Sequence, residues 1–380
     1  MGPSRARMQR AYHDPKRYLW LVGLLVPCLP FIGGGLALLT GHSVYWYFAP
    51  IFVYGIVPIL DLVVGTDPSN PPESAFAELS ADPYYMRCVY AFVPIQYAAF
   101  FWTMWMIDAG GLSTFEIIGA TISLGMVGGI AINTGHELCH KKPAFDRWVA
   151  KITLAQSAYG HFAVEHIRGH HRHVATPRDP ASSRLGEGYW RFLPRVVIGS
   201  VRSAWAIERE RLGKLGRATW STANECLQGW AITALLFAGV TLWLGVDALG
   251  LLALQAVIGF SLLEVVNYIE HYGLLRQPAA SGRPERVRPE HSWNNNNIVT
   301  NVLLYHLQRH SDHHAYASRG YQLLRDFDDA PQLPTGYAGM IVLAYVPPLW
   351  RWVMDRRVLA HYGGDISRAH ATPRARARFG

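Results

Sequence analysis

Nine of the seventeen histidines in this 380-residue chain fall in four short clusters. The clusters are HELCHK at 136–141, EHIRGHH at 165–171, NYIEHYG at 267–273 and LQRHSDHHA at 307–315. Neutral imidazole is the commonest protein ligand for transition metals. A tetrahedral ion takes four ligands and an octahedral ion six, so nine histidines predict a site with two metal ions. The candidate ligands are His136, His140, His166, His170, His171, His271, His310, His313 and His314.

The spacing within the clusters favours helices that present several imidazoles on one side. His136 and His140 are four residues apart, and so are His166 and His170. On an α-helix, residues four apart lie on one face, one turn above the other. The cluster at 307–315 repeats this spacing. Three such pairs in one chain indicate a metal site.

Each cluster also contains an acidic residue next to a histidine: Glu137, Glu165, Glu270 and Asp312. A metal-bound imidazole usually donates its second N–H to a carboxylate or a carbonyl. We therefore expect at least some of these acids to accept that hydrogen bond. The alternative is that they are solvated or paired with basic residues such as Lys141, and the sequence favours neither for any single acid.

The types of ligand narrow the choice of metal. Cys139 is the only thiol within the motifs, which argues against copper(I) and iron–sulfur chemistry. Zinc has no redox chemistry and rarely needs so many histidines, whereas iron fits a redox site with two metals. HELCH also matches the HExxH pattern of zinc proteases. That interpretation uses two histidines and leaves seven without a role.

Composition places these clusters in a membrane protein. Hydrophobic residues make up 50% of the chain and charged residues 16%, against roughly 25% charged in soluble domains. A helix needs about 20 mostly apolar residues to cross a bilayer. We predict one all-α integral membrane domain over residues 1–380, with six transmembrane helices at about 18–39, 45–64, 89–107, 112–132, 227–244 and 249–268. Residues 133–226 and 269–365 would form a histidine-rich cytoplasmic cap.

The distribution of basic residues predicts which side of the membrane carries the histidines. The turns within the three predicted hairpins, at 40–44, 108–111 and 245–248, contain no Lys or Arg. Basic residues gather before the first span and after the fourth, so the positive-inside rule places both termini in the cytoplasm. All four clusters then reach the cytoplasmic side. Basic cytoplasmic loops also account for the net charge of +8 without a nucleic-acid partner.

The histidine motifs, together with HSWNNN at 291–296 and QLPTGY at 332–337, closely resemble those of bacterial membrane-bound alkane 1-monooxygenases. The histidine pattern alone is also similar to that of membrane fatty-acyl desaturases and xylene monooxygenases. The resemblance implies a non-haem diiron enzyme of the bacterial cytoplasmic membrane, with the nine histidines as ligands of two iron ions. It implies that O₂ and two electrons convert a terminal methyl group of a linear alkane into a primary alcohol.

The same resemblance implies that rubredoxin delivers the electrons from an NADH-dependent reductase. No CxxC pair typical of a rubredoxin occurs here, so this partner would be a separate protein or a further domain. Rubredoxins are generally acidic. Arg168, Arg172, Arg178 and Arg319 are therefore candidates for the docking surface.

An alkane offers no polar group, so its binding depends on apolar burial, at about 0.8 kcal/mol per methylene from water. A substrate that arrives from lipid is already desolvated. Selectivity must then come from the shape and length of a tunnel between the helices, ending at the histidines. Candidate lining residues are Val53, Tyr54, Val57, Ile132 and Leu263.

Two other functions are compatible with parts of the sequence. A fatty-acyl desaturase or hydroxylase would need a polar entrance for an acyl carrier. A histidine-rich metal transporter would need ionisable residues within the spans. Asp61 and Glu264 are the only obvious candidates for that role, and both lie near the predicted cytoplasmic ends.

Overall fold

The computed structural model describes residues 12–380, and these residues form helices and loops without a β-strand. Five helical segments are long and apolar enough to cross a membrane: Leu19–Thr40, Ser43–Val64, Thr114–Cys139, Glu225–Leu244 and Ala248–His271. Helix α5 (Pro83–Asp108) covers the predicted span at 89–107. Its 26 residues extend about 39 Å, but aromatic residues and Gln96 lower its mean hydropathy. By apolarity, five of the six predicted spans stand out in the described chain.

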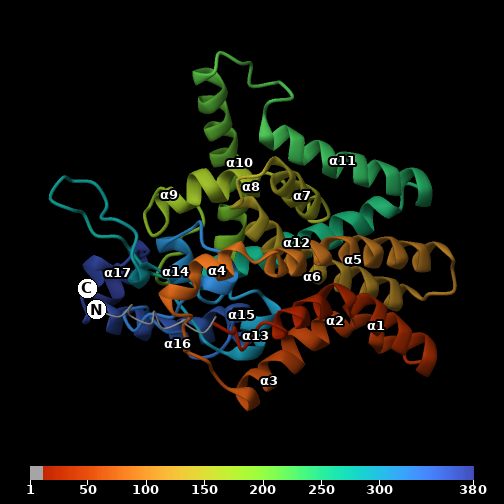
Figure 1. Ribbon diagram of the computed structural model, residues 1–380, viewed down its shortest axis with the longest axis horizontal. Coiled ribbons are helices and arrows are strands. Elements are labelled where there is room, and N and C mark those ends of the chain that lie inside the picture. Colours follow the sequence, from red (N-terminus) through yellow and green to blue (C-terminus); the bar gives the residue numbers. More distant parts are fainter. Residues whose placement is uncertain (1–11) are drawn as a thin grey trace, which may run out of the picture.

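The spans form three hairpins whose turns fall where the sequence predicts them. The first two spans are composite: η1 (Leu19–Leu24) with α1 (Leu25–Thr40), then η2 (Ser43–Tyr47), α2 (Phe48–Ile51), the π-helix η3 (Phe52–Ile56) and α3 (Val57–Val64). The other hairpins pair α5 with α6 (Thr114–Cys139) and α11 (Glu225–Leu244) with α12 (Ala248–His271). In Figure 1 the three turns lie at the right-hand end and the cap lies at the other.

Helices α6 and α12 pack closely at the centre of the bundle. A Cβ atom on Gly129 would lie 2.7 Å from the carbonyl oxygen of Gly259, and one on Gly125 would lie 2.8 Å from that of Gln255. Small residues allow the backbones of membrane helices to approach in this way. Both helices end at the cap, so this contact brings the histidines at their C-terminal ends close together.

These two central helices are longer than the sequence predicts. Helix α6 continues beyond residue 132 to Cys139, and α12 continues beyond residue 268 to His271. The predicted ends at residues 132 and 268 are therefore too early, because the helices carry His136 and His271 themselves. The added turns contain polar residues but no proline, so hydropathy falls before the helical hydrogen bonding stops.

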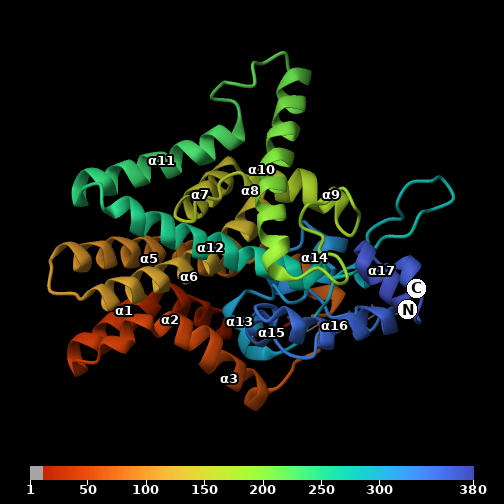
Figure 2. The same ribbon diagram turned by 180° about the vertical axis from the view of Figure 1, so that it is seen from behind.

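The cap consists mainly of short helices and loops. Its elements are η4 (Glu73–Ala75), α4 (Phe76–Ala81), α7 (Ala144–Ala155), α8 (Phe162–Glu165), the π-helix η5 (His166–His170), α9 (His171–His173), α10 (Tyr189–Lys214), η6 (Pro289–His291), α13 (Ile298–Leu303), α14 (His310–Ala315), η7 (Tyr321–Leu323), α15 (Tyr337–Ala344), α16 (Pro347–His361), η8 (Ile366–Arg368) and α17 (Pro373–Phe379). Helix α10 differs from the others. It runs across the direction of the spans and projects from the bundle in both Figure 1 and Figure 2.

Candidate metal centre and apolar cavity

The nine predicted histidines gather in two adjoining clusters at the cap ends of α6 and α12. The five-histidine cluster consists of His136, His140, His166, His171 and His313. The four-histidine cluster consists of His170, His271, His310 and His314. Within each cluster the nearest ring nitrogens all lie within 4.8 Å of one another. The rings of His171 and His314, one from each cluster, have centroids 4.5 Å apart.

The spacing of the ring nitrogens fits metal coordination. Neighbouring Nε2 atoms lie 2.9–3.1 Å apart in the five-histidine cluster and 2.8–3.2 Å apart in the four-histidine cluster. Two imidazoles at right angles, each roughly 2.1 Å from one ion, have nitrogens about 3.0 Å apart. The Nε2 atoms of His140 and His271 are buried without a hydrogen-bond partner among the described residues. The donor set therefore fits two metal ions, one in each cluster.

Two of the three predicted i,i+4 pairs remain together. His136 in the last turn of α6 and His140 directly after it both enter the five-histidine cluster. His310 and His314 of α14 both enter the four-histidine cluster, with Nε2 atoms 2.8 Å apart. His313 of the same helix joins the five-histidine cluster. Helix α14 therefore supplies both clusters.

The third predicted pair is divided by a π-helix. His166 and His170 belong to η5, whose hydrogen bonds run from residue i to i+5. The extra residue per turn brings His171 to the side of His166, with their Nε2 atoms 3.0 Å apart. His170 is left at the edge of the turn and enters the four-histidine cluster. The i,i+4 spacing of His166 and His170 therefore does not place them in the same cluster.

Three of the four predicted carboxylates have partners other than histidine. Glu137 pairs with Lys141 at 2.6 Å, Asp312 pairs with Arg319 at 2.6 Å, and Glu165 accepts a hydrogen bond from Ser203 at 3.3 Å. These acids are next to histidines in helices, where adjacent side chains point about 100° apart. The expectation that they accept the second N–H of an imidazole was therefore wrong.

Glu270 does contact a histidine, but at the nitrogen that faces the cluster. Its Oε2 lies 3.1 Å from Nε2 of His310, and its Oε1 accepts a hydrogen bond from the Tyr337 hydroxyl at 3.0 Å. The carboxylate therefore lies beside the proposed ligand atoms and not behind them, which also differs from the prediction.

Asp179 is the carboxylate that accepts the second N–H of a cluster histidine, and the sequence analysis did not identify it. Nδ1 of His170 donates to Oδ2 of Asp179 at 3.0 Å, and the Ser182 hydroxyl donates to the same oxygen at 2.6 Å. With the Nδ1 proton held in this way, the lone pair of His170 is on Nε2, inside the cluster. Asp179 lies nine residues after His170, and its position as the only acid between that histidine and Glu187 is the signal that was available.

The electrostatics keep most of these rings neutral. Burial, with repulsion from neighbouring imidazoles, holds the pKa well below its usual value for His140, His166, His171, His310, His313 and His314. Burial alone would also lower the pKa of His170. The charge of Asp179 and its hydrogen bond outweigh burial and raise it. A neutral imidazole is the form that binds a metal.

An apolar cavity lies between the spans, next to a small pocket at the histidines. Its lining includes Val26, Val53, Val57, Leu262, Leu263 and Ile341. Asn133 and Leu307 line this cavity and also a small pocket bounded by His136 and His313. Tyr337, which donates to Glu270, lines the cavity as well. The cavity therefore adjoins both clusters.

Three of the five predicted tunnel residues line this cavity, namely Val53, Val57 and Leu263. The other two do not. The Tyr54 hydroxyl is hydrogen-bonded to that of Tyr345 at 3.0 Å, and Ile132 is fully buried in the core on α6. One helical step separates Tyr54 from Val53, which is enough to turn its side chain away.

Comparison with known proteins places this arrangement in a family. The family model described as fatty acid desaturase matches residues 113–344. Alkane 1-monooxygenase 1 of Alcanivorax borkumensis is 47% identical over 95% of this chain and 90% of its own length. An alkane 1-monooxygenase of Pseudomonas putida is 46% identical over 97% and 92%. The chain belongs to the alkane 1-monooxygenase family. The hydroxylase component of xylene/toluene monooxygenase from Pseudomonas putida is more distant, at 24% identity over 95% of the chain.

The site of this family member does not support a protease or a transporter. Five histidines surround the position where HExxH would hold one zinc ion with two. Asp61 accepts from the backbone N–H of Thr300 at 3.0 Å. Glu264 accepts from the Tyr159 hydroxyl at 2.6 Å and from Asn267 at 3.0 Å. The carboxylates of both acids are thus engaged in hydrogen bonds within the packed core.

A third group of potential metal ligands includes a histidine whose ring proton is on the nitrogen that a metal would need. Glu285, Glu290 and His291 have ligand atoms within 4.8 Å of one another. However, Nδ1 of His291 accepts a hydrogen bond from the backbone N–H of Arg288 at 3.0 Å. The ring proton must then be on Nε2, which donates to Glu285 at 3.3 Å. A metal would need the lone pair of Nε2, so this group is explained by hydrogen bonding alone.

Proposed function

We propose that this protein hydroxylates a terminal carbon of linear alkanes at a pair of iron ions held by the nine histidines. The reaction consumes one alkane, one O₂, two electrons and two protons, and it yields one primary alcohol and one water. The bound iron pair would supply the activation of O₂. The convergence of nine imidazoles on two adjoining points carries the proposal, and the high identity to alkane 1-monooxygenases supports the substrate class.

The protein's own contribution is to position the alkyl chain and to exclude water. The cavity lining is almost wholly apolar, and Asn133 and Leu307 of this lining also bound the small pocket beside the five-histidine cluster. A chain bound there presents its end to the cluster, which favours the terminal carbon over the interior ones. Orientation of this kind accelerates a reaction without acid–base chemistry. The dry walls also protect the oxidising centre from side reactions.

We further propose that rubredoxin, reduced by an NADH-dependent reductase, supplies the electrons on the cytoplasmic side of the bacterial cytoplasmic membrane. His140 and His171 are the least buried ligands, so the five-histidine cluster is nearer to solvent. Arg172 and Arg178 are exposed close to them and suit an acidic partner. Arg168 and Arg319 are less suitable, because each is already paired with an acid.

The test is turnover of the purified protein with rubredoxin, reductase, NADH and octane. We expect 1-octanol, and about two irons per chain if each cluster holds one ion. His171→Ala should lose the activity and iron, whereas His42→Ala, at an exposed hairpin turn, should keep both. Acyl products without 1-octanol would support a fatty-acyl enzyme instead. Preferential oxidation of xylene would support the more distant relative's activity.

A further inference from the structure

Helix α10 lies at the level where the spans meet the cap. It runs across the direction of the spans, and the loop at 215–224 connects it directly to α11. Only 11% of the apolar window of α11 is buried inside the protein, so this span faces lipid on most sides. A helix that crosses the span direction and adjoins a lipid-facing span lies along the membrane surface.

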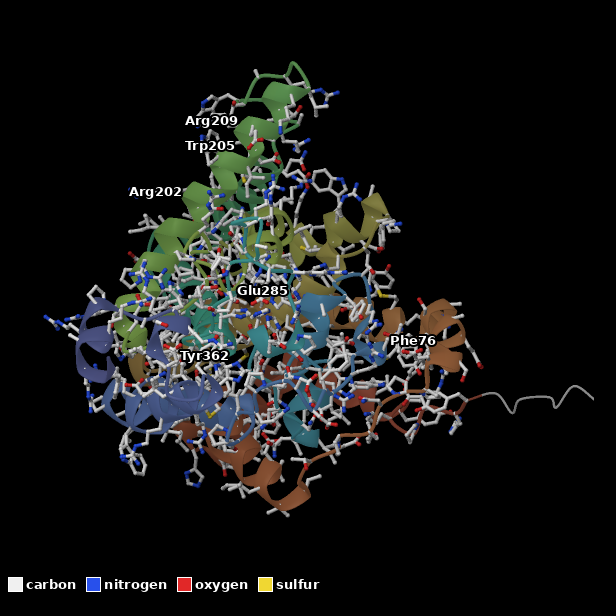
Figure 3. All side chains as sticks on the ribbon, turned by 90° about the vertical axis from the view of Figure 1, so that its left-hand side faces the viewer. Phe76, Arg202, Trp205, Arg209, Glu285 and Tyr362 are labelled. Carbon is white, nitrogen blue, oxygen red and sulfur yellow. The ribbon has the colours of Figure 1, made fainter. Side chains whose placement is uncertain are left out.

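The two faces of α10 have different neighbours. The inward face is a row of residues spaced by four, including Ser200, Ala204 and Glu208, all buried. Glu208 accepts from Arg168 at 2.7 Å and so connects α10 to the π-helix η5. The outward face carries Arg202 and Arg209. Figure 3 shows these two arginines along the outer edge of the helix, with Trp205 between them.

Aromatic side chains gather where α10 meets α11. The ring of Trp205 lies 5.0 Å from that of Trp220 and stacks on that of Trp230 at 5.9 Å, measured between centroids. Trp220 is 77% exposed, and Ile198, further along α10, is 52% exposed. Tryptophan is enriched at the boundary between lipid and water, because its ring is apolar and its N–H is polar.

The charges on the outward face lack a protein partner. Arg168, Arg211 and Lys214 each form an ion pair with a nearby glutamate. Among residues 12–380, no carboxylate lies within ion-pair distance of Arg202 or Arg209, although both are exposed. Two unpaired arginines flanking a half-buried tryptophan complement a phosphate-bearing, partly apolar surface.

We propose that the outward face of α10 binds the phosphate groups of anionic phospholipids, with Arg202 and Arg209 as the phosphate ligands. Trp205 and Trp220 lie at the depth of the headgroups. Lipid bound here steadies α10 and, through Glu208 and Arg168, the π-helix that supplies histidines to both clusters. This binding does not depend on the metal chemistry or on the substrate proposed above.

The experiment is a native mass spectrometry titration of the full-length, iron-loaded protein in detergent with phosphatidylglycerol and, separately, phosphatidylcholine. Each arginine near an anionic surface changes affinity about fivefold. Arg202→Gln with Arg209→Gln should therefore weaken phosphatidylglycerol binding about thirtyfold and leave phosphatidylcholine binding unchanged. Arg202→Lys with Arg209→Lys keeps the charge and should restore most of the affinity.

The matched control is Arg283→Gln with Arg286→Gln, which removes the same charge from an exposed loop of the cap. It should leave phosphatidylglycerol binding within about twofold. Equal losses in both double variants would overturn the proposal, because net charge alone would then explain the binding. A dimer in the wild type that Arg202→Gln with Arg209→Gln dissociates would also overturn it, in favour of a second copy of the chain as the occupant.

Discussion

Two histidine segments with the same spacing behave differently in this fold. His136 and His140 are carried at the end of a regular α-helix, and both enter the five-histidine cluster. His166 and His170 are also four residues apart, but the π-helix η5 sends them to different clusters. The two segments contribute in different ways. The end of α6 builds one side of one cluster, whereas 166–171 joins the two.

The difference shows how one fold can hold two adjoining sites. Segments 166–171 and 310–314 each supply both clusters, while α6 and α12 each supply one. A segment that supplies both fixes the distance between them. A π turn suits this role, because it places three nearby side chains on one broad side of the helix. The two shared segments therefore act as the connection, and the two central helices as the supports.

The largest expected effect on iron content and activity comes from replacing two histidines at a time. One pair lies at the end of α6, which supplies one cluster, and the other lies in segment 166–171, which supplies both. His136→Ala with His140→Ala takes two donors from the five-histidine cluster and should leave about one iron per chain, in the intact four-histidine cluster. His170→Ala with His171→Ala takes one donor from each and should weaken both irons. Both variants should lose at least about a thousandfold in alkane hydroxylation, since ligand loss exceeds the 10–100-fold typical of supporting residues.

Iron content by mass spectrometry during stepwise chelation distinguishes the two variants. Retention of about one tightly held iron is expected only for His136→Ala with His140→Ala. Loss of both irons from that variant would show that the two clusters do not bind iron independently. The different roles given to the end of α6 and to segment 166–171 would then be wrong. His42→Ala serves as the control, since this exposed residue is remote from both clusters in the sequence and lies at a hairpin turn.

The sequence predicts the members of this site better than their arrangement. Imidazole has few structural uses in such density, so type and spacing identify all nine residues. Their division between clusters depends on the hydrogen-bond register of each helix. The pairs beginning at His136, His166 and His310 have equal spacing, yet only the second meets a π turn. Spacing alone does not encode that turn.

The sequence also predicts the positions of the spans better than the exact helix ends and side-chain directions. Hydropathy predicts the spans and their turns because the bilayer imposes a length and an apolar composition. It ends α6 too early, since hydrogen bonding continues into polar residues up to Cys139. The tunnel prediction places both Val53 and Tyr54 on the cavity wall, whereas the Tyr54 side chain turns away to Tyr345. Side-chain direction depends on packing that a single sequence does not display.

A smaller effect is expected from the carboxylate that supports the shared segment. Asp179→Asn removes the negative charge that accepts the Nδ1–H of His170. It should weaken iron binding in the four-histidine cluster by roughly 10–100-fold, the loss typical when the carboxylate partner of a metal-bound histidine is replaced. Glu137→Gln is the matched control, because Glu137 is next to His136 yet pairs with Lys141. It should change iron affinity less than about threefold. Equal effects of the two variants would contradict the role given to Asp179.

The smallest effect is a difference in pH dependence between the clusters. Asp179 raises the pKa of His170, whereas burial lowers that of His140, His166 and His171. A metal binds only the unprotonated ring, so the affinity of a site falls as the pH decreases through the pKa of its ligands. The four-histidine cluster therefore starts to lose affinity at a higher pH than the five-histidine cluster.

Titration of the metal-free protein with Co²⁺ at pH 7.5 and pH 6.0 measures this difference through the visible bands of each site. We expect the five-histidine site to keep more of its affinity and the four-histidine site to weaken by up to about thirtyfold, the limit for competition by one proton over this pH interval. Asp179→Asn should remove most of the pH effect, because the pKa of His170 is then no longer raised. Parallel weakening of both sites in the wild type would mean that protonation of His170 does not distinguish the clusters. The segment 166–171 would then join them through geometry alone.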